Sequence, residues 1–137
     1  MDEFAKVIKE LKKKTFAAEL ANGKIFGTNG CAVEVLMSKM KEDEEFFMDS
    51  LVGVKILDKA GALLMVHANV CGVYAKNITE DAEEILEYFA IETEYENKIA
   101  DIPEEKCQVK NKKISYKDVV KDVEDPMEAF EKLNELF

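Results

Sequence analysis

The chain has a single histidine, His67, and a cysteine, Cys71, follows it four residues later. Imidazole and thiolate groups bind zinc, and a histidine beside a thiol can act as the base that activates it. The two residues would supply at most half of such a site. We expect His67 to be structural, because the negative end of a helix favours a histidine, and Cys71 to be a small buried side chain. The alternative is a metal or acid–base role.

Cys31 follows Asn29-Gly30 at an expected helix start, a position that lowers the pKa of a thiol and favours a reactive thiolate. However, the nearby sequence offers no histidine, so we expect no nucleophilic or redox role. Cys31, Cys71 and Cys107 are odd in number and widely spaced, without a Cys-x-x-Cys pair. This pattern is typical of reduced thiols in the cytoplasm, where we expect the protein to reside.

Length and composition favour one soluble domain spanning residues 1–137, with 47% hydrophobic residues. The net charge of −10 opposes binding to nucleic acids and to anionic membranes. All 19 basic residues are lysine, so the chain has no guanidinium fork to clamp a phosphate. No apolar run approaches the roughly 20 residues that span a bilayer. We expect the lysine-rich segment 98–121 to be a solvated surface rather than an RNA-binding strip.

The apolar spacing predicts an N-terminal helix with Phe4, Val7, Ile8 and Leu11 on one side. Asn22-Gly23 then predicts a two-residue hairpin turn between two strands. A second helix follows, whose apolar stripe is Val33, Leu36, Met37 and Met40.

From Lys55 to Ala68 the chain is apolar on almost every side, which predicts a central buried helix. A strand, a helix capped by Thr79 and a further strand form a βαβ unit from Val70 to Glu96, with a right-handed crossover. Asp125-Pro126 begins a last helix. The sequence therefore predicts an α/β fold: a three-layer α-β-α sandwich with a mixed sheet, led by an antiparallel hairpin.

Residues 58–96 and 123–130 resemble a small uncharacterised prokaryotic family, a domain of unknown function, with a cytidine-deaminase-like fold. Its most specific shared feature is Val-Tyr-Ala-Lys, Val73–Lys76, followed by Ile-Thr-Glu. The chain departs from the family at Asp58, where the family has glycine, and around Cys107. There the family pattern Asn-Arg-Asp-Gly-Thr and Cys-Pro-Met-Glu is missing.

The deaminase-like resemblance implies two zinc motifs, His-x-Glu and Pro-Cys-x-x-Cys, at helix starts on one rim of the sheet. The corresponding helix starts here are 55–59 and 77–82, and neither contains a histidine or a cysteine. His67 lies at the opposite rim and lacks the glutamate two residues later. We therefore expect neither a metal site nor a cofactor, and a chain that is not a zinc-dependent cytidine deaminase.

Ligands of open α/β sheets gather beyond the carboxyl ends of parallel strands, next to helix N-termini. Lys59 matches a recurrent lysine of the resembling family and could bind an anion or act in acid–base or Schiff-base chemistry. The alternatives are that Lys59 only pairs with a carboxylate, such as Asp58 or Glu80, and that Thr79 and Glu80 only cap a helix. The candidate ligand-binding residues at this rim are Lys55, Asp58, Lys59, Asn77, Thr79 and Glu80.

The first functional hypothesis is a non-catalytic protein that binds a small nucleotide-like ligand at this rim. The second is a metal-independent hydrolase or lyase that uses Lys59 with a nearby carboxylate. The third is a structural or partner-binding subunit. Analogy with the fold also favours a homo-oligomer.

Overall fold

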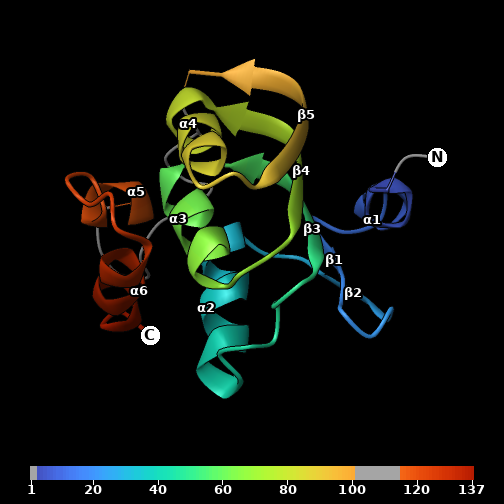
Figure 1. Ribbon diagram of the computed structural model, residues 1–137, viewed down its shortest axis with the longest axis horizontal. Coiled ribbons are helices and arrows are strands. Elements are labelled where there is room, and N and C mark those ends of the chain that lie inside the picture. The colour runs from blue at the N-terminus through green and yellow to red at the C-terminus, as the bar shows by residue number, and fades with distance from the viewer. Residues whose placement is uncertain (1–2, 101–114) are drawn as a thin grey trace.

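The computed structural model describes residues 3–100 and 115–137 and contains a five-stranded mixed sheet flanked by helices (Figure 1). The strand order is β2-β1-β3-β4-β5. The hairpin strands pair antiparallel and β1 also pairs antiparallel with β3, whereas β3, β4 and β5 are parallel. The strands are β1 (Phe16–Glu19), β2 (Ile25–Thr28), β3 (Leu51–Leu57), β4 (Gly72–Thr79) and β5 (Glu92–Ile99).

In the described part of the chain, one helix covers one face of the sheet, and three helices cover the other face (Figure 1). Two further helices near the C-terminus pack on α3, on the side away from the sheet. The helices are α1 (Ala5–Leu11) on the first face, α2 (Ala32–Glu42), α3 (Lys59–His67) and α4 (Glu80–Tyr88) on the second, and α5 (Tyr116–Val119) and α6 (Pro126–Asn134) outside α3. Among the described residues, no helix has the length and apolar character to cross a membrane.

The buried helix expected from Lys55 to Ala68 is wrong at its start, because residues 51–57 form β3 and the helix begins at Lys59. The run Leu-Val-Gly-Val-Lys-Ile-Leu is rich in β-branched residues. Val52 and Val54 point to the face of the sheet that α2, α3 and α4 cover. Asp58 ends the strand and caps the helix, since its Oδ1 accepts a hydrogen bond from Gly61 N at 3.2 Å. The extra strand makes two consecutive parallel crossovers, β3-α3-β4 and β4-α4-β5.

The hairpin is confirmed, but its turn differs from the two-residue turn that Asn22-Gly23 predicted. Gly23 N donates to Leu20 O at 2.8 Å, and Leu20 N donates to Lys24 O at 2.9 Å. Gly23 has a φ of 87°, whereas Asn22 does not have a positive φ. The loop is therefore the longer kind in which one residue, a glycine, takes the left-handed conformation.

Other local predictions are confirmed. Thr79 caps α4, with its hydroxyl accepting from Ala82 N at 3.4 Å. Asp125 caps α6 in the same way through Met127 N, and Pro126 is the first helical residue. Of the lysine-rich segment 98–121, residues 101–114 lie outside the described residues, and Cys107 is among them.

The sheet separates two hydrophobic clusters. The large one lies between the sheet and α2, α3 and α4, and it includes Leu36, Leu63 and Leu86, all fully buried. The small one lies under α1 and consists of Phe4, Val7, Leu11, Ala17 and Tyr74. The candidate site lies on the side of the large cluster, because that is where the helix N-termini meet the ends of the parallel strands.

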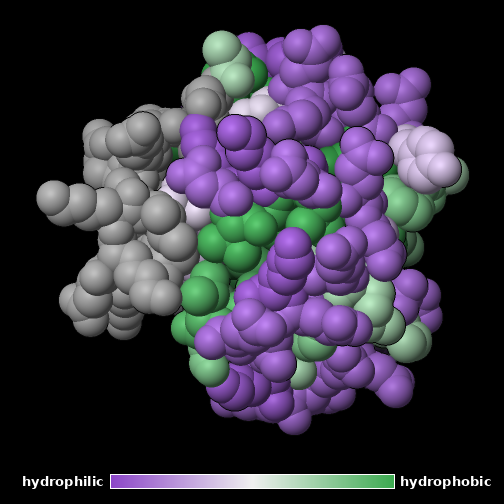
Figure 2. Space-filling view, turned by 90° about the vertical axis from the view of Figure 1, so that its left-hand side faces the viewer, coloured by the Kyte–Doolittle hydropathy of each residue, from purple (hydrophilic) through white to green (hydrophobic). Residues whose placement is uncertain are grey.

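The face of the molecule beside α5 and α6 is mostly hydrophilic (Figure 2). A band of hydrophobic side chains crosses it in a shallow hollow between the hydrophilic ones. The exposed large hydrophobic residues include Tyr88 of α4, which is 83% exposed, and Met127 of α6, which is 51% exposed. Scattered apolar side chains are normal on protein surfaces, so these residues alone do not identify a binding site.

Candidate functional site

Asp58 lies at the rim of the sheet, between the end of β3 and the start of α3. Its side chain is buried, with the residue only 7% exposed. One carboxyl oxygen, Oδ1, caps the helix through Gly61 N. The other, Oδ2, is buried and has no hydrogen-bond partner among the described residues. Buried polar atoms are nearly always paired, so this free oxygen marks Asp58 as the most unusual polar group in the described structure.

The surroundings of Asp58 favour its neutral form. Burial raises the pKa of this carboxyl above the ordinary value of 3.8, and the nearby charge of Asp81 raises it further. The hydrogen bond from Gly61 N and the charge of Lys117 lower the pKa, but burial is the largest cause and the net shift is upward. Asp58 therefore keeps a proton to higher pH than an exposed aspartate does, and a protonated carboxyl can donate as well as accept hydrogen bonds.

A cavity of about 450 Å³ lies beside Asp58, between the N-termini of α2 and α3. We call it the Asp58 cavity. Ala32, Val33, Val54 and Ile56 are its apolar lining residues, and Asp58 and Glu34 are its acidic ones. Its full lining is Thr15, Gly30, Cys31, Ala32, Val33, Glu34, Val54, Lys55, Ile56 and Asp58.

The edge of the Asp58 cavity is fixed by contacts between the start of β1 and the turn before α2. The Thr15 hydroxyl accepts from Gly30 N at 2.8 Å and donates to Gly30 O at 3.0 Å. Thr15 N also donates to Asn29 Oδ1 at 3.2 Å. Gly30 has a φ of 146°, which L side chains rarely adopt, and a Cβ there would lie 3.2 Å from Val35 Cγ2. These contacts hold the N-terminus of α2 next to the end of β3.

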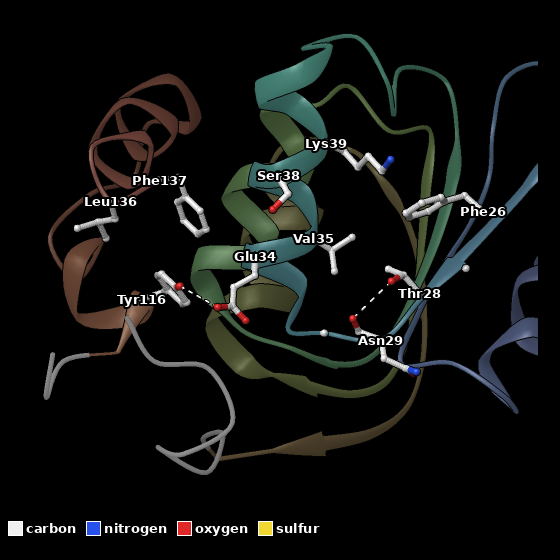
Figure 3. A pocket seen from close by; sticks show the side chains of 12 residues that line it. Phe26, Thr28, Asn29, Glu34, Val35, Ser38, Lys39, Tyr116, Leu136 and Phe137 are labelled. Carbon is white, nitrogen blue, oxygen red and sulfur yellow. Dashed lines mark hydrogen bonds between the residues drawn. The ribbon is translucent and has the colours of Figure 1, made fainter. Parts of the chain in front are cut away.

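A second cavity, of about 650 Å³, runs along α2 and shares Gly30 and Glu34 with the Asp58 cavity (Figure 3). We call it the α2 cavity. Phe26, Thr28 and Asn29 form one side, and Tyr116, Leu136 and Phe137 form the other. The α2 residues that line it are Glu34, Val35, Ser38 and Lys39.

Glu34 stands where the two cavities meet and is linked to the C-terminal part of the chain. The Tyr116 hydroxyl donates to Glu34 Oε2 at 3.2 Å (Figure 3), and the Tyr116 ring stacks on Phe137 with 5.8 Å between ring centroids. Burial, followed by the Glu34 charge, raises the pKa of Tyr116, so the phenol stays protonated and remains a donor. This bond holds the Glu34 carboxylate toward Tyr116.

The six residues predicted at the rim do not all line one cavity in the structure. Lys55 and Asp58 line the Asp58 cavity, but alternation along β3 places the Lys55 side chain on the same face as Gly53, which is packed against α1. Lys59 lines a third cavity, of about 870 Å³, between α4 and the α5–α6 segment. Its Nζ donates to the Lys121 carbonyl at 2.9 Å, where the sequence suggested a carboxylate partner.

The other three predicted residues do not line the Asp58 cavity. Asn77 Nδ2 donates to Lys55 O at 3.1 Å and so joins β4 to β3. The Thr79 hydroxyl caps α4 and donates to Asp81 Oδ1 at 2.5 Å. Glu80 is exposed in the first turn of α4. The helix starts that meet at one cavity are those of α2 and α3, rather than α3 and α4 as the sequence suggested.

His67 has structural contacts. Its Nε2 lies 3.3 Å from Glu44 Oε1, and its ring stacks on Phe130 with 4.2 Å between centroids, which joins α6 to the end of α3.

The prediction that Cys71 is buried is wrong, because this free thiol is exposed beside the Asp49 carbonyl. The expectation of reduced thiols is also wrong for Cys31, which is disulfide-bonded. A sulfur in a disulfide is not a free nucleophile.

Among residues 3–100 and 115–137, no group of three or more histidine, cysteine, aspartate or glutamate side chains is arranged to hold a metal ion. The cavity residues that sequence reasoning missed include Thr15, Gly30, Glu34 and Lys39. The turn Thr28-Asn29-Gly30 before a helix was a usable signal, because a glycine there allows close approach to the helix N-terminus. The contribution of Thr15 had no local signal.

Residues 6–137 match the model of a protein family described as a domain of unknown function, DUF1893. Among solved structures, the chain is similar to the crystal structure of a DUF1893 family protein from Thermotoga maritima. That match has a TM-score of 0.80 and 18% sequence identity, and it covers 100% of this chain and 92% of that chain. At this identity the structural likeness shows a shared fold only.

Comparison with curated proteins finds no match. The family match extends over nearly the whole chain, including both cavities and the helices that form them. The predicted resemblance to an uncharacterised family, a domain of unknown function, is therefore confirmed. The chain belongs to the DUF1893 family.

Proposed function

We propose that this protein is a non-catalytic binder of a small nucleotide-like ligand, whose planar base occupies the Asp58 cavity. The observation that carries the proposal is the buried Oδ2 of Asp58, which lacks a hydrogen-bond partner among the described residues and belongs to a residue that lines a cavity. A buried polar atom without a partner is costly, and a ligand that pairs with it removes that cost.

The chemistry of the Asp58 cavity suits a heterocyclic base. A carboxyl group can accept a hydrogen bond from a ring N–H or amino group and, when protonated, donate one to a ring nitrogen or carbonyl. Burial raises the pKa of Asp58, so its protonated form persists to higher pH than that of an exposed aspartate. The apolar walls from Ala32, Val33, Val54 and Ile56 would contact the faces of a flat ring.

The proposal includes a cytidine-deaminase-like scaffold. It is supported by the leading hairpin, the mixed sheet with three parallel strands, and two helix starts that meet at one cavity. The residues at those starts do not suit the zinc chemistry of deaminases. Cys31 is disulfide-bonded, and the start of α3 presents Asp58 and Lys59 where a metal site would need thiolates or imidazoles. This favours binding over zinc-dependent deamination.

The geometry does not favour an enzyme built on Lys59. Its Nζ is hydrogen-bonded to a backbone carbonyl and its side chain lines the third cavity rather than the Asp58 cavity. A lysine that forms a Schiff base needs a free amine facing its substrate.

Binding of the four common ribonucleosides and their free bases tests the proposal, by calorimetry and by the shift in melting temperature. We expect at least one of them to bind the wild-type protein and to bind Asp58→Asn at least about tenfold more weakly, since a hydrogen bond to a buried charged or acidic group contributes about 1.5–3 kcal/mol. Asparagine keeps the shape and the helix cap but changes the donors and acceptors.

The matched control is Asp125→Asn, because Asp125 also caps a helix but does not line either of the two cavities. This variant should bind like the wild type. The proposal is wrong if no base or nucleoside binds the folded protein, or if Asp58→Asn binds as tightly as the wild type.

A further inference from the structure

The α2 cavity continues the Asp58 cavity in one direction. The two share Gly30 and Glu34, and the lining then follows α2 from Ala32 to Lys39. Seven residues of an α-helix rise about 10 Å, which is close to the length of a mononucleotide from its base to its phosphate. A ligand whose base lies at Asp58 would therefore extend along α2 toward Lys39.

Lys39 is a cation held in place at the far end of the α2 cavity. Its Nζ lies 5.2 Å from the ring centroid of Phe26 and 5.2 Å from that of Phe46. Its Nζ also lies 3.7 Å from Glu42 Oε2, an i,i+3 ion pair whose glutamate side chain is 74% exposed. The lysine side chain is 33% exposed, so its ammonium group remains reachable from solvent. Two aromatic faces thus fix the position of this charge without neutralising it.

The negatively charged residue of the α2 cavity, Glu34, lies away from Lys39. Figure 3 shows Lys39 near Phe26, and Glu34 on the other side, near Tyr116. The Glu34 carboxylate accepts the Tyr116 hydroxyl, which turns it toward the C-terminal segment. Lys39 is the one lysine among the residues that line this cavity, all of which belong to the described part of the chain. An anionic group would therefore be attracted to the Lys39 end.

We infer that the α2 cavity is a second part of the same ligand site and binds an anionic group, a phosphate ester, through Lys39. This inference rests on the proposed function, since it assumes a base at Asp58, and it specifies the ligand as a nucleoside monophosphate rather than a nucleoside. The protein carries a net charge of −10, which repels anions in general. A local cation is therefore needed for any preference for the phosphorylated form.

Affinities for each ribonucleoside and its 5′-monophosphate test the inference, measured by calorimetry at low salt. We expect the monophosphate to bind about fivefold more tightly, the gain of a partly exposed ion pair, and the preference to fall at high salt. Lys39→Gln should abolish the preference by lowering the affinity for the monophosphate to that for the nucleoside. Lys39→Arg should keep it, as should the control Lys24→Gln, which changes an exposed lysine in the hairpin turn.

Phenyl phosphate serves as a second probe, because it carries a phosphate ester but no base edge for Asp58. It should shift the NMR signals of Phe26 and Ser38 in the wild type and in Asp58→Asn, but not in Lys39→Gln, and phenol should shift them less. If phenyl phosphate binds in this way and nucleosides do not bind, the base site is wrong and the Lys39 site stands. The inference is overturned if phosphorylation gives no preference, if Lys39→Gln retains it, or if phenyl phosphate leaves these signals unchanged.

Discussion

Replacement of Gly53 by alanine is expected to lower the free energy of unfolding by about 1–3 kcal/mol, the usual cost of overpacking a core. Gly53 lies in β3, at the centre of the sheet, and faces α1. A Cβ at this position would lie 2.1 Å from Val7 Cγ1 and 3.0 Å from Leu11 Cδ1, both of which are buried. Because both side chains belong to the buried cluster under α1, the added Cβ would force them, or α1 itself, to move.

Denaturant-induced unfolding of Gly53→Ala measures this loss. The matched control is Gly27→Ala in β2, where the added Cβ would meet only the partly exposed side chain of Glu10. That side chain can rotate away, so the control should lose much less stability. The double variant Val7→Ala/Gly53→Ala should be less destabilised than the sum of the two single variants. Additive losses would mean that the close approach of α1 to Gly53 does not exist in solution.

Asp58 is expected to reduce the stability of the ligand-free protein at neutral pH, so Asp58→Ser should be more stable than the wild type. Serine caps a helix as well as aspartate does and has no second oxygen to leave unpaired. An unpaired buried group costs about 1–3 kcal/mol, whereas the attraction of a carboxylate to the helix N-terminus contributes only about 0.3–1 kcal/mol. The cost of the unpaired oxygen exceeds the attraction to the helix end, so Asp58→Ser should have a free energy of unfolding about 1–2 kcal/mol higher than the wild type.

The gain should depend on pH. The folded protein holds the Asp58 proton more tightly than the unfolded chain, so the cost of Asp58 increases as the pH rises from 3.8 through its raised folded-state pKa. Below this window the carboxyl is protonated in both states, and the difference between wild type and Asp58→Ser should become small. Urea unfolding of both proteins across this range measures the difference, with Asp125→Ser as the control cap. A difference that does not vary with pH would contradict the raised pKa.

The sequence predicts most helices of this fold because their apolar stripes and caps are local. It missed α5, which lies in the segment expected to be a solvated surface although Tyr116 is buried. Phe4, Val7 and Leu11 are buried as expected, and Thr79 caps α4 through a backbone amide three residues later. The sequence was misleading at β3, because the apolar residues of this strand run directly into the apolar residues of α3. The prediction therefore assigned Lys55 and Ile56 to the helix. Only the carboxyl of Asp58 marks the boundary, and an aspartate within a long apolar segment is a weak signal.

The candidate site is less predictable for a different reason. The sequence included Asp58 among the rim residues although it missed β3, and it could not show which helix lies beside that residue. Thr15 and Gly30, which are fifteen residues apart, bring the start of α2 there through two hydrogen bonds. The positions of Glu34 and Lys39 follow from that contact. No pattern around Asp58 encodes it.

Of the described helices, α1 alone lies on its face of the sheet, and this placement has a consequence for motion. The small cluster beneath it is separated by the sheet from the large cluster, which forms the walls of both cavities. This helix can therefore detach briefly from the sheet while the binding region stays intact. Amide hydrogens of Ala5–Leu11 should exchange with deuterium in the solvent well before those of Lys59–His67, as mass spectrometry would detect.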